Sequence, residues 1–154
     1  KRKQGLVKLL QYLNTLIQSM AKTISKLKKE LDKWFSFYIR LRSADENGNN
    51  QCCTCGKIDN WRNLQCGHFV SRKHIATRFH ELNCFPQCIA CNIFRNGEQW
   101  KFGQFLDRNI EEGISEELII LGHTVLKISK VEYEDYISYY KDAVEKLKKE
   151  KGIE

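Results

Sequence analysis

Apolar residues recur at alternating steps of four and three positions through the first quarter of the chain. The positions are Leu6, Leu10, Leu13, Ile17, Met20, Ile24, Leu27, Leu31, Trp34, Tyr38 and Leu41. This is heptad spacing, and neither proline nor glycine interrupts it after Gly5. It predicts one long helix with an apolar seam. At the usual rise per residue this helix would be roughly 55 Å long, so its seam requires a partner.

Shorter elements follow this helix. The polar stretch DENGNN at residues 45–50 ends the helix. Two strands are expected, over 57–61 and 65–71, and two short helices over 98–109 and 114–122. Ser129 and Glu132 form a capping-box pattern, which predicts a final helix that ends near Lys149. The chain therefore divides into a heptad helix (1–44), a central core (51–110) and a C-terminal helical segment (111–154).

Two partners could cover the apolar seam. The first is a second copy of the chain, and we expect a homodimer through the front half of the helix, near residues 6–24, with the back half on the central core. The second is the final helix, which carries an apolar stripe of its own. That stripe consists of Tyr133, Ile137, Tyr140, Val144 and Leu147. The final helix is about half as long as the seam, so it could cover only part of it.

Charge and hydropathy narrow the possible partners. The formal net charge is +7 and the pI is near 9.0, which favours a polyanionic partner. The excess lies at the front, since residues 1–50 contain 11 Lys and Arg against 4 Asp and Glu. The sequence has no run of 18 apolar residues and no pattern of a secretory signal. We therefore expect a protein that neither crosses a membrane nor is secreted.

The cysteines are spaced as metal ligands. The chain has seven, an odd number that does not suit a complete disulfide framework. Four of them form two C-x-x-C pairs, Cys52 with Cys55 and Cys88 with Cys91, which is a spacing typical of structural zinc sites. A hairpin knuckle followed by a knuckle that opens a helix is the plan of a treble clef. The alternative is that the cysteines are reduced and pack as small hydrophobic residues.

A histidine and two asparagines surround the second cysteine pair. His68 lies on the expected strand 65–71, Asn83 precedes Cys88 by five residues, and Asn92 follows Cys91. A hairpin with a histidine, a loop asparagine and a helix with an asparagine form the layout of ββα-metal, or HNH, nucleases. A neutral imidazole can take a proton from water near pH 7, provided that a loop amide or carbonyl orients it. A hard divalent cation would stabilise the charge on the phosphate.

Several short stretches resemble the phage NinG family, also called Rap, of recombination endonucleases. They are FSFYIRLRSADENGN, CCTCGK, QCGHFVSR, ATRFHELNCFPQCIACN and NGE, between about Lys28 and Gly97. The resemblance implies metal-dependent, structure-specific cleavage of branched DNA, such as Holliday junctions and D-loops, in the cytoplasm of a bacterial host. It implies an α+β fold with a small zinc-bound ββα-metal core, flanked by the long N-terminal helix and C-terminal helices.

The same resemblance implies roles for individual residues. Cys52, Cys55, Cys88 and Cys91 would hold structural Zn²⁺. His68 would be the general base, Asn83 its orienting residue, and Asn92 a ligand of the catalytic Mg²⁺ or Mn²⁺. Many HNH enzymes have an acidic metal ligand just before the base, where this chain has Gly67. A further ligand must then be another side chain, a backbone carbonyl, water or phosphate.

Four basic residues near the expected site are candidates for DNA binding. Arg72, Lys73, Arg78 and Arg95 could neutralise phosphates without reading sequence. The alternatives are solvated surface charges and, for Arg78, an internal ion pair. The roles of Cys53, Cys66 and Cys84 stay open between buried thiols and, for the latter two, zinc ligation. Two other functions also stay open: a non-catalytic zinc module that binds nucleic acid or protein, and a sequence-specific HNH endonuclease.

Overall fold

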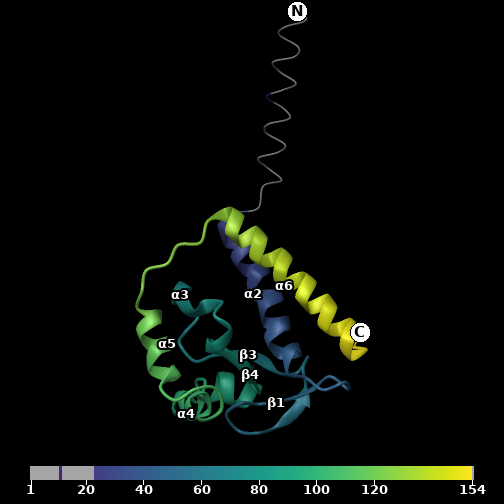
Figure 1. Ribbon diagram of the computed structural model, residues 1–154, viewed down its shortest axis with the longest axis vertical. Coiled ribbons are helices and arrows are strands. Elements are labelled where there is room, and N and C mark those ends of the chain that lie inside the picture. The colour runs from purple at the N-terminus through teal and green to yellow at the C-terminus, as the bar shows by residue number, and fades with distance from the viewer. Residues whose placement is uncertain (1–10, 12–22, 154) are drawn as a thin grey trace, which may run out of the picture.

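Two antiparallel strand pairs form the sheets in the part of the chain that the structure describes, Gln11 and residues 23–153. In this computed structural model, β1 (Asn49–Gln51) pairs with β2 (Ile58–Asn60), and β3 (Gln65–His68) pairs with β4 (Cys84–Gln87). Helical elements surround these pairs (Figure 1). They are α2 (Ile24–Arg42), α3 (Ile75–Arg78), η1 (Glu81–Asn83), η2 (Ala90–Phe94), α4 (Gln99–Asn109), α5 (Ile114–Gly122) and α6 (Lys130–Lys151). The α+β fold with flanking long helices is confirmed.

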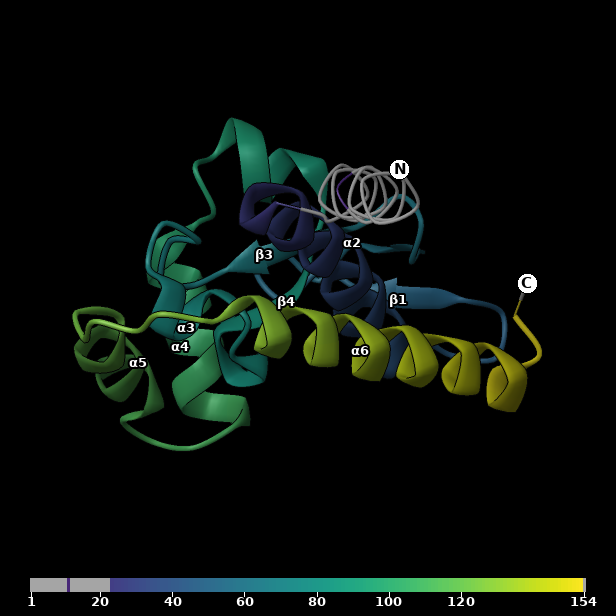
Figure 2. The same cartoon turned by 90° about the horizontal axis from the view of Figure 1, so that it is seen from above.

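Helices α2 and α6 lie side by side and cover each other's apolar faces (Figures 1 and 2). In α6, Tyr133, Tyr140 and Val144 of the predicted stripe are buried. The predicted capping box starts this helix, since the Ser129 hydroxyl accepts from the Glu132 amide at 3.3 Å and the Glu132 carboxylate accepts from the Ser129 amide at 2.7 Å. The back half of the seam is therefore covered within the chain.

The predicted long helix is present from Ile24, but it is not unbroken. Thr23 has an extended backbone and caps α2, because its side chain accepts a hydrogen bond from the Lys26 amide. The seam positions from Leu6 to Met20, and with them the predicted dimer contact, lie outside the described residues. Within α2 the burial follows the heptad only in part. Leu27, Leu31 and Leu41 of the seam are buried, but Phe35 and Ile39 are buried in place of their neighbours Trp34 and Tyr38, which are partly exposed.

The β3–β4 hairpin lies between α2 on one side and α4 with α5 on the other (Figure 2). Towards α2, Cys84 joins a core with Leu31, Phe35 and Tyr140. Towards α4, residues of the hairpin and of the segment after it pack against buried apolar residues of α4 and α5. The hairpin is thereby held on both faces, which fixes the direction in which its side chains project.

The expected strands 57–61 and 65–71 correspond to the shorter β2 and β3, and the short helices over 98–109 and 114–122 correspond to α4 and α5. Their partners, β1 and β4, are elements that the sequence did not predict. None of the helices in the described part of the chain has the length and apolar character required to span a bilayer.

Candidate functional site

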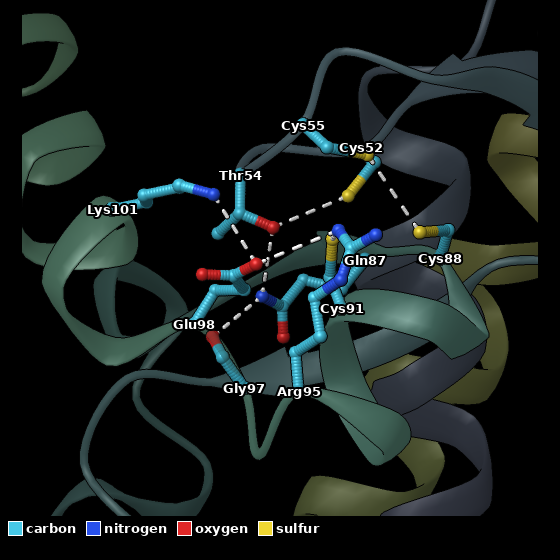
Figure 3. A network of polar contacts seen from close by, with 10 residues as sticks. All are labelled: Cys52, Thr54, Cys55, Gln87, Cys88, Cys91, Arg95, Gly97, Glu98 and Lys101. Atoms are coloured by element: carbon cyan, nitrogen blue, oxygen red, sulfur yellow. Dashed lines mark hydrogen bonds and ion pairs between the residues drawn. The ribbon is translucent and has the colours of Figure 1, made fainter.

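The four paired cysteines converge on one point. The sulfur atoms of Cys52, Cys55, Cys88 and Cys91 all lie within 4.8 Å of one another. The Cys55 and Cys88 sulfurs are 3.7 Å apart, close to the edge of about 3.8 Å that a tetrahedron with Zn–S bonds of about 2.3 Å requires. Figure 3 shows the four side chains pointing towards one another from the β1–β2 loop and from the segment after β4. The cluster can hold a zinc ion, as the spacing predicted.

A tight turn in each C-x-x-C knuckle directs both of its cysteine sulfurs towards the centre of the cluster. In the first knuckle the Gly56 amide donates to the Cys52 carbonyl at 2.9 Å, and Gly56 has φ of +75°, a conformation that favours glycine. In the second, the Asn92 amide donates to the Cys88 carbonyl at 2.9 Å and the Gly97 amide to the Cys91 carbonyl at 2.8 Å. Two residues between the cysteines therefore suffice to bring each pair to the same centre.

The chemistry of this donor set suits zinc. Burial and neighbouring thiols raise the pKa of Cys55 to about 12. At Cys52 burial acts in the same direction, but hydrogen bonds from Thr54 and the backbone outweigh it and lower the pKa to about 6. Four thiols so close together cannot all ionise without a cation, and Zn²⁺ supplies the charge that allows it. With four thiolates bound, the tetrahedron would be closed, which is typical of a structural site.

Arg95 lies beside this cluster. Its guanidinium is 3.7 Å from the Cys91 sulfur and 3.5 Å from the Glu98 carboxylate, which Lys101 also approaches at 3.2 Å (Figure 3). A four-thiolate zinc site would have a net charge of −2, and the Arg95 guanidinium beside Cys91 would offset part of it. Arg95, predicted to contact DNA, is thus placed at the cysteine cluster.

A separate open cleft of about 1060 Å³ lies next to α2. His68 and Asn92 both line it, together with Arg72. Four exposed basic residues are among the lining: Lys29, Lys33, Arg62 and Arg72. Among the described residues that line the cleft, Asp32 is the only carboxylate. The cleft therefore presents a positive surface, which attracts a polyanion.

His68 is oriented by a loop carbonyl. Its Nε2 lies 3.0 Å from the Arg78 carbonyl oxygen. Because a carbonyl only accepts, Nε2 carries the proton and Nδ1 carries the lone pair. Burial lowers the pKa of the imidazole below its ordinary value of 6.5, while hydrogen bonds with the backbone of Arg78 and Cys66 act in the opposite direction. The neutral ring is the form that can accept a proton.

Arg78 forms the internal ion pair that the sequence left as an alternative. Its Nε and Nη2 donate to the two carboxylate oxygens of Asp32 at 2.8 and 2.6 Å, and its Nη1 donates to the Arg72 carbonyl. The side chain is only 14% exposed. The guanidinium is therefore occupied by Asp32 within the protein, which favours the internal ion pair, while contact between Arg78 and DNA stays a prediction. Arg72 lines the cleft, whereas Lys73 is exposed but is not among the residues that line it.

Asn83 organises the loop between β3 and β4. It is fully buried, its amide nitrogen donates to the carbonyls of Val70 and Thr77 at 2.9 and 3.0 Å, and its oxygen accepts from the Val70 amide at 2.7 Å. The partner of the imidazole is Arg78 and not Asn83. The prediction that Asn83 orients His68 is therefore corrected to an indirect effect: Asn83 holds the loop that contains Arg78.

The described residues of the cleft offer few free oxygen ligands for the catalytic cation that the sequence suggested, and that metal site stays a prediction. The Asn92 amide nitrogen donates to the Gln65 side chain at 2.7 Å, so only its oxygen is left to bind a cation. Both oxygens of Asp32 are bound to Arg78. These residues do not match the oxygen-rich site that Mg²⁺ or Mn²⁺ prefers.

The side chain of Gln87 on β4 leaves no room for a side chain at Gly67. A β carbon at this position would lie within 2.7 Å of Cγ and Cδ of Gln87 and still closer to its amide oxygen. Gln87 is fully buried, and its amide donates to the Gly97 carbonyl at 2.8 Å and to the Thr54 hydroxyl at 3.2 Å. The side chain of Gln87 therefore occupies the space that an acidic residue at position 67 would need.

Three residues of the site were missed by the sequence analysis. Asp32 forms the ion pair with Arg78, and Gln65 accepts a hydrogen bond from Asn92. Gln87 fills the space beside Gly67. Asp32 lies 46 positions from its partner, and no local spacing pointed to it. Gln65 and Gln87 face each other in the β3–β4 register, which a predicted β4 would have made visible.

The family model described as "Bacteriophage Lambda NinG protein" matches residues 13–150. This match spans the cysteine cluster, the cleft and helices α2 to α6. Comparisons with curated proteins and with solved structures gave no match.

Proposed function

The chain belongs to the NinG family of the bacteriophage lambda NinG protein, and we propose that it is an endonuclease that cuts branched DNA recombination intermediates. The observation that carries the proposal is a partly buried, loop-oriented histidine, His68, in a positively charged cleft. The four-cysteine cluster would hold zinc as a structural element next to it. Holliday junctions and D-loops are the substrates that the sequence resemblance implies.

His68 supplies the proton acceptor in this proposal. With its Nε2 proton directed at the Arg78 carbonyl, the ring has its lone pair on Nδ1. Burial keeps the ring neutral, so it can remove a proton from the water that attacks phosphorus. The P–O bond to the leaving oxygen then breaks, and that oxygen takes up a proton. General-base catalysis of this kind typically contributes about 10²- to 10⁴-fold.

The basic lining of the cleft would hold the phosphate backbone. Lys29, Lys33, Arg62 and Arg72 can neutralise phosphates from the α2 side and from the loops around β3. Such contacts position DNA without reading its sequence, which suits an enzyme that selects DNA by its shape. They also make binding strongly dependent on salt concentration.

The dependence on Mg²⁺ or Mn²⁺ stays a prediction. Such a cation would stabilise charge on the phosphate, and Asn92 would contribute one oxygen ligand. Because the lining residues offer no unpaired carboxylate, we assign no step of the reaction to the cation.

One assay separates this proposal from its two alternatives. The wild type and His68→Ala are incubated with a labelled four-way junction and with linear duplexes of the same arm sequences, with and without Mg²⁺ or Mn²⁺. We expect the wild type to cut the junction, and His68→Ala to bind it with unchanged affinity but cut at least about 100-fold more slowly. Binding without cleavage by either protein would support a non-catalytic zinc module. Cleavage of a linear duplex at one defined sequence would support a sequence-specific HNH enzyme.

We further propose that the chain forms a homodimer through the seam positions that precede α2. Two incisions are needed to resolve a junction, and a two-fold dimer matches that symmetry. The test is sedimentation of the full chain beside a chain that starts at Thr23 and keeps the cap of α2. We expect a dimer and a monomer respectively. A monomeric full chain at micromolar concentration would refute the dimer and leave the nuclease proposal untouched.

A further inference from the structure

A second group of metal-binding side chains lies on the β3–β4 hairpin. Cys66 and His68 are two residues apart on β3 and so project from the same face, and Cys84 is the direct partner of His68 on β4. One ligand atom from each of the three lies within 4.8 Å of the others. None of them belongs to the four-cysteine cluster, although the sequence had left Cys66 and Cys84 as competing ligands there.

We propose that Cys66, His68 and Cys84 form a second metal site, which binds a thiophilic divalent cation of the Zn²⁺ class. Two thiolates and an imidazole are ligands that Zn²⁺ prefers and Mg²⁺ does not. Tetrahedral zinc needs ligand atoms about 3.5–3.8 Å apart, so the three side chains need to close by about 1 Å at most. A change of side-chain rotamers within one hairpin can supply such a movement.

This site would be open on one side. Cys66 and His68 line the cleft, whereas Cys84 is fully buried against α2. Three protein ligands with a fourth position directed towards solvent would leave room for water or another exogenous ligand. The site would therefore exchange its cation more readily than the closed four-cysteine cluster.

Occupancy would have a consequence for catalysis. An imidazole whose lone pair binds zinc cannot accept a proton from water, so zinc at this site would inhibit cleavage. This consequence rests on the proposed nuclease function, whereas the metal site itself does not. The competing interpretation is that Cys66 and Cys84 only pack with the apolar residues around them.

The experiment is a metal titration of the full chain in its reduced, zinc-loaded form. Co²⁺ is added and free metal is removed, and total bound metal is then measured together with the thiolate-to-cobalt absorption. We expect two metal ions per wild-type chain, one of them exchangeable, and one per chain in Cys66→Ser and Cys84→Ala. Cys53→Ser is the matched control, because Cys53 belongs to neither group, and it should keep two.

A wild type that binds one ion, or a second ion that persists in both variants, would overturn the site. Circular dichroism checks that each variant is folded. If Cys84→Ala does not fold, Cys66→Ser alone decides, since Cys66 is only partly buried. Where junction cleavage is observed, added Zn²⁺ should inhibit the wild type and inhibit Cys66→Ser at least tenfold less, each relative to its own rate without added zinc. Equal inhibition of the two proteins would refute the link to catalysis while leaving the metal count to judge the site.

Discussion

The four-cysteine cluster and the His68 cleft lie close together but are assembled in different ways. All four ligands of the cluster belong to two short knuckles, each shaped by its own turn. The cleft instead combines α2, the loop after β3 and η2, and its histidine is oriented by a residue that is itself held from α2. Local spacing thus determines the metal cluster, whereas tertiary packing determines the cleft. Loss of the cluster should therefore affect both regions, whereas substitutions in the cleft should leave the zinc content unchanged.

The largest expected effect is the loss of the cluster. Cys88→Ser removes one of four zinc ligands, and zinc binding is coupled to folding of such segments. We expect loss of zinc and unfolding of the central region, and with it loss of any cleavage. Metal analysis and circular dichroism measure this, with Cys53→Ser as the control. A folded variant without zinc would show that the cleft does not depend on the cluster.

The second-largest effect is expected from breaking the ion pair between Asp32 and Arg78. Asp32→Asn leaves Arg78 without its charged partner, so the carbonyl that orients His68 would move. We expect a loss of stability of about 1–3 kcal/mol, less than for a fully buried pair because Asp32 is partly exposed. Cleavage should fall by roughly 10- to 100-fold while zinc content is unchanged.

The pH–rate profile of Asp32→Asn tests whether Asp32 positions His68 or only supports the fold. The Asp32 charge favours the protonated form of His68, so its removal should move the acid limb of the pH–rate profile to lower pH. Asp59→Asn is the matched control, since Asp59 on β2 forms an ion pair with Lys57 and does not line the cleft. A slower enzyme with an unchanged pH profile would indicate that Asp32 only supports the fold.

A smaller effect is expected from the rim of the cleft. Arg72→Ala should weaken junction binding several-fold, and the slope of log affinity against log salt should fall by about one. Lys146→Ala removes the same charge from α6, where Lys146 is exposed and pairs with Glu150. This control should change neither quantity, and an equal effect of the two substitutions would contradict binding in the cleft.

The smallest expected effect concerns the pH at which kcat/KM and stability begin to decline. The pKa of folded His68 lies below 6.5, so the neutral base persists as pH falls past that value, and kcat/KM should decline only at lower pH. The unfolded chain takes up a proton near 6.5 while the folded chain does not. Stability should therefore decrease as pH falls from 6.5 towards the folded pKa, and His68→Ala should reduce this dependence. A decline of kcat/KM that begins above pH 6.5 would contradict a base whose pKa is lowered by its surroundings.

The same difference explains which features could be predicted from the sequence and which could not. Cys52, Cys55, Cys88 and Cys91 were predicted as one cluster because ligand spacing is local. The stripe of Tyr133, Tyr140 and Val144 was predicted because helix periodicity is local too. The pairing of Asp32 with Arg78 depends on how α2 lies against the hairpin, and no periodicity encodes it. For the same reason the sequence could not show that Arg78 pairs with Asp32, or that the imidazole of His68 contacts the Arg78 carbonyl and not Asn83.

The packing of Gln87 over Gly67 has a consequence for how these two positions can vary among related chains. A side chain at 67 collides with the Gln87 amide, and Gln87 is anchored on both sides by Gly97 and Thr54. An acidic residue before the histidine therefore requires a smaller residue in place of Gln87. We expect sequences of this family to fall into two groups, Gly with Gln or Asp with a small residue, and the mixed combinations to be rare.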